Sequence, residues 1–317
     1  MELGVVDLDG PLDGQVDAMD RACRDLGFFR IPVDVVDRPI REAAWDTATE
    51  FFALDEATKR EIEFPEPGYP YGYSPYRAET LAKSLDDDEA RPDLKESLSV
   101  GPDCGPMRRL VDGEAWIMSP SLWPSQVPEL QPAWTAYYRV LSDVAEQLMR
   151  VMALALDLPA DHFARFIDRP ITSMRALHYP AASPSDVALR AGAHADALRA
   201  GAHTDYGTFT ILRTDDVPGL EIVGPDGEWV GVEPDPDFFV VNLGDTIAQW
   251  TNDRWRSTLH RVVPAAAPRQ SFAFFHMANW DARIECLPTC LEPGEAPRHE
   301  PAQADPWLMR KFQSTVV

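Results

Sequence analysis

The sequence predicts an α+β protein with a double-stranded β-helix (jelly-roll) core, an N-terminal helical layer and a long supporting helix. Two observations favour this fold. Apolar residues recur at helical spacing up to about residue 158, and short strand-like runs alternate with turn signals from residue 172 onward. No linker separates the halves, so we expect one domain over 1–317, mostly helical in 1–171 and a jelly roll in 172–317.

Helical periodicity and capping residues define the elements of the first half. Asp37 followed by Pro39 predicts a helix start, because a proline in the first turn loses no hydrogen bond, and this helix is expected to end at Phe52. The longest apolar stripe, at 129–158, predicts a helix that packs on the core. The other expected elements are a strand at 5–10, a helix at about 14–26, a strand at 27–32, a helix from near Asp55, a Pro/Gly/Tyr-rich loop at 64–77 and a short helix at about 160–166.

Strand-like runs follow one another in the second half. Pro225-Asp226-Gly227 separates two of them and predicts a hairpin turn. Seven or eight short strands at this spacing fit a jelly roll. The runs are SMRALHY (173–179), YGTFTILRT (206–214), LEIVG (220–224), EWVGVE (228–233), DFFVVNLG (237–244), STLHRVV (257–263) and RQSFAFFHM (269–277).

Composition limits the classes of partner. Acidic residues outnumber basic ones by 52 to 29, for a net charge of −23, and such a surface repels nucleic acid and anionic membranes. No apolar run approaches the roughly 18 residues of a membrane helix, and the N-terminus lacks a secretory signal pattern. The four scattered cysteines favour free thiols. We therefore expect a cytoplasmic protein that binds neither nucleic acid nor an anionic membrane, and we expect a monomer or a homodimer.

A nonapeptide occurs twice in succession. Residues 188–196 (ALRAGAHAD) and 197–205 (ALRAGAHTD) differ at one position, and each contains a His-x-Asp pair. The second pair precedes the alternating run YGTFTIL, whereas the first precedes ALRAGA, which lacks this pattern. If one strand starts at His203 and continues through YGTFTIL, residues two apart share a face, so the second pair, His203 and Asp205, is the better candidate for a metal. We interpret the first pair, His194 and Asp196, as a relic of a tandem duplication in a surface loop; a slipped register that uses the first pair is the alternative.

Further residues complete a candidate metal centre. His260, in STLHRVV, can supply a second imidazole. Two histidines and one carboxylate leave open positions on a metal, which is the arrangement of non-haem Fe(II) oxygenases. Arg269 and Ser271 lie two apart on the last long strand, and an arginine fork is suited to a carboxylate. These residues together suggest a dicarboxylate that chelates the metal at one end and is anchored at the other.

The ordered motifs resemble the isopenicillin N synthase-like branch of the Fe(II)/2-oxoglutarate-dependent oxygenases, over nearly the whole chain. The resembling segments are GFFRI (27–31), FFALDEATKREI (51–62), GY (72–73), DLKESLSVG (93–101), WP (123–124), ALALDLPADHF (153–163), HYP (178–180), GAHTDYGTFTIL (201–212), GLEI (219–222), VNLGDTIAQWTNDRWRSTLHRVV (241–263) and RQSFAFFH (269–276).

The resemblance implies a role for each matching residue. His203, Asp205 and His260 are the expected Fe(II) ligands. The distal carboxylate of 2-oxoglutarate is expected to meet Arg269, Ser271 and Tyr179. Residues that fall where relatives line the substrate pocket, or that share a face with Tyr179, are Arg175, Tyr206, Phe209, Tyr73 and Arg77.

The implied activity is a dioxygenase that uses Fe(II), 2-oxoglutarate and O₂. It would hydroxylate, desaturate or cyclise a small molecule such as an amino acid, a peptide-like compound or a natural product, and release succinate and CO₂. The pair Arg269 and Ser271 could equally bind a substrate carboxylate. A 2-oxoglutarate-independent Fe(II) oxidase or cyclase and an ethylene-forming enzyme are therefore alternatives, and a non-catalytic ligand-binding jelly roll is a third.

Overall fold

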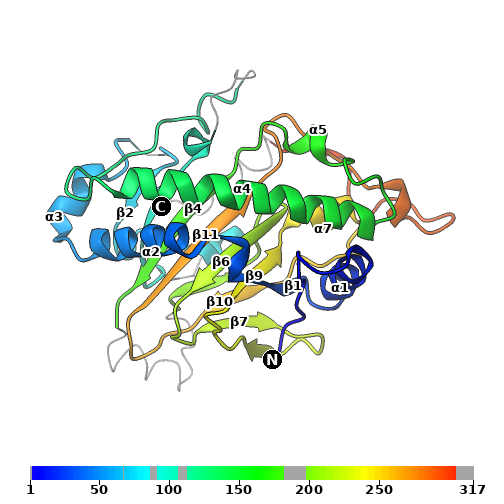
Figure 1. Cartoon of the computed structure of the whole chain (residues 1–317), viewed down its shortest axis with the longest axis horizontal. Helices are drawn as coiled ribbons and strands as arrows, with labels where there is room; N and C mark the ends of the chain where they lie inside the picture. The colour runs from blue at the N-terminus through cyan, green and yellow to red at the C-terminus, as the bar shows by residue number, and fades with distance from the viewer. Residues whose placement is uncertain (1, 67, 86–90, 106–112, 182–197, 305–317) are drawn as a thin grey trace.

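The structure of the chain is a computed structural model (Figure 1). It describes the residues at 2–66, 68–85, 91–105, 113–181 and 198–304.

A helical layer lies on one side of the molecule, with the long helix α4 (Leu130–Ala155) running across the sheet and α2 (Arg38–Phe52) beside it (Figure 1). The other helices are short except the first: α1 (Leu12–Asp25), α3 (Glu56–Lys59), α5 (Ala164–Ile167) and α7 (Asp245–Trp250). Helix α2 ends at Phe52 as predicted. Asp37 is its N-cap residue, although the side chain makes no capping hydrogen bond, whereas Asp55 caps α3 by accepting from the Thr58 amide. None of the described helices is long and apolar enough to cross a membrane.

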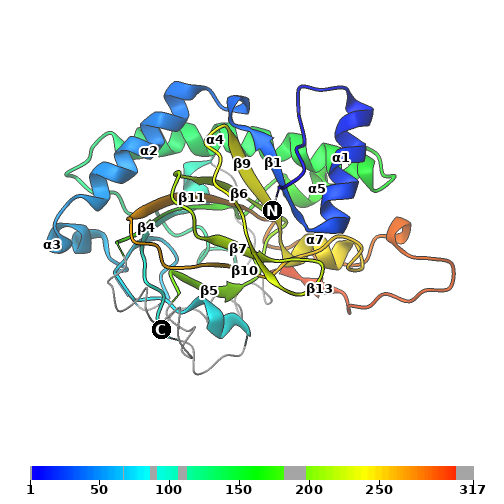
Figure 2. The same ribbon diagram turned by 90° about the horizontal axis from the view of Figure 1, so that it is seen from below.

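Two antiparallel sheets form the jelly roll. The larger has the order β1-β9-β6-β11-β4-β3-β2 and the smaller the order β5-β10-β7-β8. Figure 2 shows the helical layer on one side of the larger sheet and the smaller sheet on the other. The strands are β1 (Phe28–Pro32), β2 (Gly72–Ser74), β3 (Glu96–Val100), β4 (Ser173–Tyr179), β5 (Ala200–His203), β6 (Phe209–Thr214), β7 (Leu220–Val223), β8 (Trp229–Gly231), β9 (Phe238–Leu243), β10 (His260–Val262) and β11 (Arg269–His276), with a separate pair β12 (Arg283–Ile284) and β13 (Ala302–Gln303).

The two faces of β11 have different partners. Phe272 and Phe274 point toward α4, where the Trp134 and Tyr138 rings meet them with centroid separations of 4.7 and 5.3 Å. The alternate residues of β11, which start with Arg269, face the space between the sheets. Because side chains alternate along a strand, the apolar face that anchors the helices also fixes which residues enter that space.

The strands differ from the sequence-based expectation in three places. Residues 5–10 form no strand, and only Val5 makes an isolated bridge, with Arg30. The predicted loop at 64–77 contains β2, which pairs with β3. Residues 200–203, which lack an alternating apolar pattern, nevertheless form β5 because they pair with β10.

Candidate metal centre and its cavity

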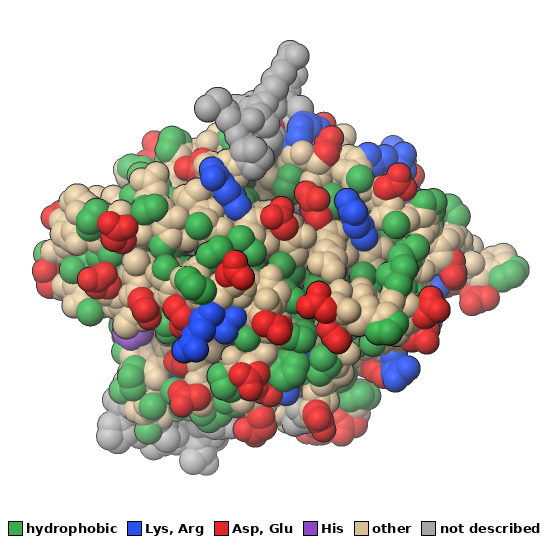
Figure 3. All heavy atoms as spheres, viewed as in Figure 1, with side chains coloured by type: hydrophobic (Ala, Val, Ile, Leu, Met, Phe, Trp, Pro, Cys, Tyr) green, Lys and Arg blue, Asp and Glu red, His purple; other side chains and the backbone are tan. Residues whose placement is uncertain are grey.

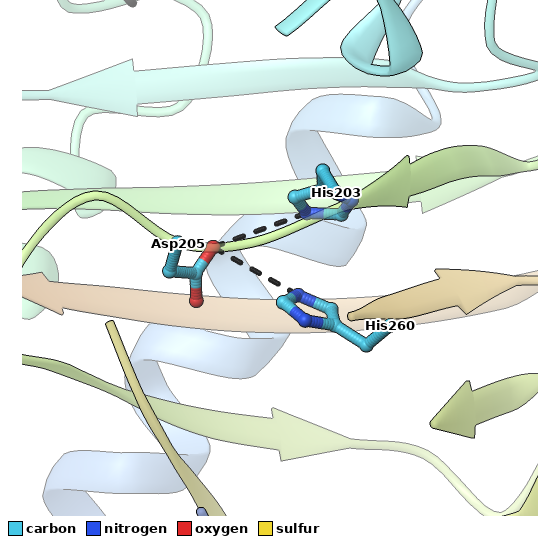
Figure 4. A group of neighbouring side chains, drawn as sticks. All are labelled: His203, Asp205 and His260. Atoms are coloured by element: carbon cyan, nitrogen blue, oxygen red, sulfur yellow. Dashed lines mark ion pairs between the residues drawn. The ribbon is translucent and has the colours of Figure 1, made fainter. Parts of the chain in front are cut away.

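Three side chains converge between the sheets (Figure 4). His203 is the last residue of β5, His260 is the first of β10, and the two residues are paired in register. Their Nε2 atoms lie 3.9 and 3.8 Å from Oδ1 of Asp205. One ligand atom from each residue falls within 4.8 Å of the other two, a spacing at which all three can bind one ion.

Backbone carbonyls orient both imidazoles. Nδ1 of His203 lies 2.7 Å from the Gly201 carbonyl oxygen, and Nδ1 of His260 lies 3.1 Å from that of Thr258. A carbonyl only accepts, so each Nδ1 carries the proton, and the Nε2 lone pair is left for a metal. Hydrogen bonds of this kind fix the ring orientation of histidine ligands in metal sites.

Asp205 is held through its other oxygen. Oδ2 accepts from Nδ2 of Asn242 at 2.6 Å and from the hydroxyl of Thr210, so Oδ1 is directed at the histidines. Burial alone would raise the pKa of this carboxyl, but the facing His260 and His203 and the two hydrogen bonds lower it below its usual range. The carboxylate therefore stays ionised although Asp205 is only 7% exposed.

Burial has the opposite effect on the first imidazole. Desolvation, and then the neighbouring His260, lower the pKa of His203 to about 3. A neutral imidazole is the form that binds metal, so the ring needs no deprotonation near neutral pH.

The turn that carries Asp205 docks on the start of α7. The amides of Gly244 and Asp245 donate to the carbonyls of Thr208 and Asp205 at 2.9 and 2.8 Å. A Cβ on Gly207 would lie 2.3 Å from the carbonyl oxygen of His276, and one on Gly244 would lie 2.3 Å from that of Gly207. Glycine at these two positions is thus required for the close approach that places the aspartate.

The expectation of one continuous strand from His203 onward was wrong. Strand β5 ends at His203, a turn follows, and β6 starts at Phe209 in the other sheet. The turn changes which residues face inward. Thr210 and Leu212 line the cavity, while Phe209 is fully buried in the main core, stacked on His276 at a centroid distance of 4.8 Å. Phe209 is therefore not a pocket residue.

One cavity is lined both by the three candidate ligands and by the other predicted anchors, which are at most 2% exposed; the part lined by these buried anchors is named its closed end. Arg269, Ser271 and Tyr179 all line it, and the Arg269 guanidinium carbon lies 5.1 Å from the centre of the Tyr179 ring. Nε and Nη1 of Arg269 are buried and have no hydrogen-bond partner among the described residues. Since buried polar groups are normally satisfied, these donors suit a carboxylate or another anion that enters the cavity.

Arg175 also lines the cavity, together with Glu79 and Ser99, and lies four residues from Tyr179 along β4, hence nearer the other end. Its Nε donates to the Ser99 hydroxyl at 2.7 Å and its Nη1 donates to Glu79 at 3.1 Å. Lys95 also donates to Glu79, and Arg175 and Lys95 outweigh the effect of burial, lowering the pKa of Glu79 to about 2. The arginine is thereby held in place with part of its side chain exposed to the cavity.

Apolar groups complete this end. Tyr206, predicted as a pocket residue, lines the cavity. Tyr71, Trp116, Ile117, Ile171 and Met277 line it as well.

Two other predicted pocket residues lie elsewhere. Tyr73 is buried in the main core and donates its hydroxyl to Glu96 at 2.5 Å. Tyr73 is paired with Leu98 of β3, which faces the same core, so the register of the sheet directs the Tyr73 side chain into that core. Arg77 is exposed at the surface, where its guanidinium lies over the Tyr76 ring. Neither residue lines the cavity; Tyr71, before β2, does.

Several residues of the site were not predicted. Asn242 and Thr210 bind Asp205, and Glu79 holds Arg175. Thr210 lies five positions after Asp205, so a prediction of a turn followed by a strand could have identified it. Asn242 and Glu79 are distant in sequence from the residues that they contact. The first histidine pair, His194 and Asp196, lies outside the described residues.

Comparison with known proteins agrees with this geometry. The family model described as the 2OG-Fe(II) oxygenase superfamily matches residues 171–278, and that described as the non-haem dioxygenase in morphine synthesis N-terminal matches residues 4–126. The 2-oxoglutarate-Fe(II) type oxidoreductase hxnY of Emericella nidulans is 32% identical over 300 residues, which cover 93% of this chain and 82% of the relative. The homoarginine-6-hydroxylase 2-ODD-233 of Oryza sativa subsp. japonica is 30% identical over 307 residues, 95% of this chain and 89% of the relative.

Solved structures share the whole architecture. A full-length Neurospora crassa protein in complex with alpha-KG superimposes with a TM-score of 0.83 at 27% identity, covering 98% of this chain and 96% of that one. A 2OG-Fe(II) oxygenase family protein from Caulobacter crescentus has a TM-score of 0.82 at 28% identity and covers 98% of both chains. The chain belongs to the 2OG-Fe(II) oxygenase superfamily. It is a dioxygenase that uses Fe(II), 2-oxoglutarate and O₂ to oxidise a small molecule.

Proposed function

We propose that His203, Asp205 and His260 hold the Fe(II), and that Arg269, Ser271 and Tyr179 anchor the distal carboxylate of 2-oxoglutarate. The observation that carries this proposal is the buried pair of unpartnered Arg269 donors at the closed end of a cavity whose lining also includes the three ligands. When bound, the iron and 2-oxoglutarate supply the activation of O₂, with succinate and CO₂ as coproducts.

The chain's own residues have three tasks in this reaction. Hydrogen bonds from Asn242 and Thr210 keep the Asp205 carboxylate ionised and aimed at the histidines. Apolar side chains around the closed end, such as Leu212 and Val262, exclude water from the anchored cosubstrate. A fixed Arg269 fork sets the orientation in which a dicarboxylate enters.

The substrate binds at the other end, against Arg175 and Tyr206. Arg175 has Nε and Nη1 occupied by Ser99 and Glu79, which leaves Nη2 to donate to an oxygen of the substrate. The rest of this end is aromatic and apolar. A compact, flat molecule with a carbonyl or carboxylate oxygen suits it; solved complexes of the Neurospora crassa protein hold thymine or 5-formyluracil, compounds of that shape.

Arg269→Gln tests the cosubstrate anchor. We expect its affinity for 2-oxoglutarate, measured by calorimetry on Mn(II)-loaded protein, to fall about tenfold or more, because a charge-assisted pair is lost. Arg261→Gln is the matched control, since Arg261 on β10 pairs with Glu221 and does not line the cavity. Equal effects in the two variants would contradict the proposed anchor.

Arg175→Met tests the substrate end. With a panel of pyrimidines, small carboxylic acids and amides, the wild-type protein should release succinate faster with a matching compound. The variant should lose this stimulation while its affinity for 2-oxoglutarate stays unchanged. Retained stimulation, or a parallel loss of 2-oxoglutarate affinity, would overturn the assignment of Arg175.

The organisation of the protein is also part of the proposal. We propose that residues 1–317 act as one domain, which the shared core of helices and sheet supports. Acidic side chains are spread over the face seen in Figure 3, which disfavours nucleic acid as a partner. Free thiols at Cys23, Cys286 and Cys290 suit a cytoplasmic protein, and we propose that it is a monomer or a homodimer.

A further inference from the structure

A second arginine lies behind the closed end of the cavity. Arg199 is fully buried, and its guanidinium carbon lies 5.8 Å from the centre of the Tyr179 ring, which Arg269 also approaches. Arg199 itself does not line the cavity. Two buried guanidinium groups thus flank one tyrosine at the place where the cosubstrate carboxylate is proposed to bind.

The contacts of Arg199 satisfy only part of its guanidinium. Nη2 donates to the carbonyls of Pro180, Ala265 and Ala267 at 2.9, 3.0 and 2.6 Å. Nε and Nη1 are buried without a hydrogen-bond partner in the described part of the chain. There, neither Arg199 nor Arg269 forms an ion pair with a carboxylate, as Arg213 does with Glu42, and the Asp215 carboxylate acts on both only from beyond ion-pair distance.

Such an arrangement has an electrostatic cost. A buried charge is unfavourable unless an opposite charge compensates it, and two cations around one ring also repel each other. Accordingly, burial and then the charge of Arg269 lower the pKa of Arg199. An anion bound at the closed end would relieve this repulsion for both arginines at once.

We infer that Arg199 is a positioning residue for the cosubstrate: a second buried cation that strengthens binding of the distal carboxylate without touching it. The inference rests on the proposed Arg269 anchor and adds a residue that acts from behind Tyr179. Through Nη2, Arg199 also ties the chain after β4 to the segment before β11, which keeps Tyr179 and Arg269 side by side.

Arg199 lies in the second copy of the repeated nonapeptide. The second copy contains Arg199 as well as His203 and Asp205, so one nine-residue unit supplies two metal ligands and the buried cation. The first copy carries Arg190 at the equivalent position, outside the described residues. Arg190→Gln is therefore a control with the same local sequence.

The test compares two ligands on Mn(II)-loaded protein by calorimetry. 2-Oxopentanoate matches 2-oxoglutarate except that a methyl group replaces the distal carboxylate. The wild-type protein should bind 2-oxoglutarate more tightly, and Arg199→Gln should reduce this preference about tenfold, the order expected for one charge pair in a partly buried site. Arg199→Lys keeps the charge and should stay within about threefold of the wild-type preference, and Arg190→Gln should leave it unchanged.

Four other outcomes would overturn the role of Arg199, its assignment to the second copy, or the Arg269 anchor. Equal weakening of both ligands by Arg199→Gln would assign a purely structural role and overturn the inference. So would a tenfold loss of preference in Arg199→Lys, a result that can be obtained even if the glutamine variant does not fold. A wild-type protein without any preference would instead refute the Arg269 anchor itself. An equal effect in Arg190→Gln would overturn the assignment to the second copy.

Discussion

Asn242→Leu should weaken metal binding without removing a metal ligand. In the structure Oδ2 of Asp205 has two hydrogen-bond donors, Asn242 at 2.6 Å and the Thr210 hydroxyl, and the carboxylate is almost fully buried. A hydrogen bond to a charged group contributes about 1.5–3 kcal/mol, so losing one should weaken Mn(II) affinity by about 10- to 100-fold. The loss should grow as pH falls, because the missing donor raises the pKa of Asp205 and protons then compete better with the metal.

The assay is calorimetric titration with Mn(II) at two pH values, with thermal unfolding of the metal-free protein as a check on folding. Asn279→Leu is the matched control: Asn279 is also buried and donates to a carboxylate, that of Asp168, at 2.6 Å, but it does not line the cavity. An unchanged affinity in Asn242→Leu, or an equal loss in Asn279→Leu, would refute the role given to Asn242.

Three further predictions concern the ligands, the turn and the core. His203→Ala should abolish bound iron and turnover while His194→Ala retains both, and the reverse result in metal analysis would show that the first copy binds the metal. Gly207→Ala should lower the free energy of unfolding by about 1–3 kcal/mol, because its Cβ would lie 2.3 Å from the His276 carbonyl, whereas Gly14→Ala in α1, which meets open space, should raise it by about 0.5–1 kcal/mol. Burial lowers the pKa of His276 to about 3, so as the pH falls this imidazole is protonated in the unfolded chain before it is protonated in the folded protein. The free energy of unfolding of the metal-free wild-type protein should therefore fall between pH 7 and pH 5 by about 2 kcal/mol more than that of His276→Gln. Denaturant titrations at the two pH values check the last prediction, and parallel curves for the two proteins would contradict it.

Local periodicity was sufficient for the elements whose pattern is complete within one segment. Helix α2 and strands β4 and β11 lie where the pattern placed them, because apolar residues at the spacing of a helix or a strand mark the buried face directly. The same two-residue alternation brings Arg269 and Ser271 to one face of β11. Predictions of this kind need no knowledge of other parts of the chain.

Other features depend on residues that are distant in sequence. The turn between His203 and Phe209 forms because Gly207 approaches His276 and the start of α7, contacts that no local pattern reveals. For this reason the predicted single strand, and with it the inward direction of Phe209, was wrong. Tyr73 likewise takes its direction from pairing with β3, and Arg175 is held by Glu79 across 96 positions of sequence.

The most direct test of the central claim is anomalous diffraction from crystals grown with Mn(II) and 2-oxoglutarate. We predict one strong peak bounded by Nε2 of His203, Nε2 of His260 and Oδ1 of Asp205, with the dicarboxylate running from it to Arg269. A peak at the first His-x-Asp pair, or no peak between these three atoms, would contradict the account.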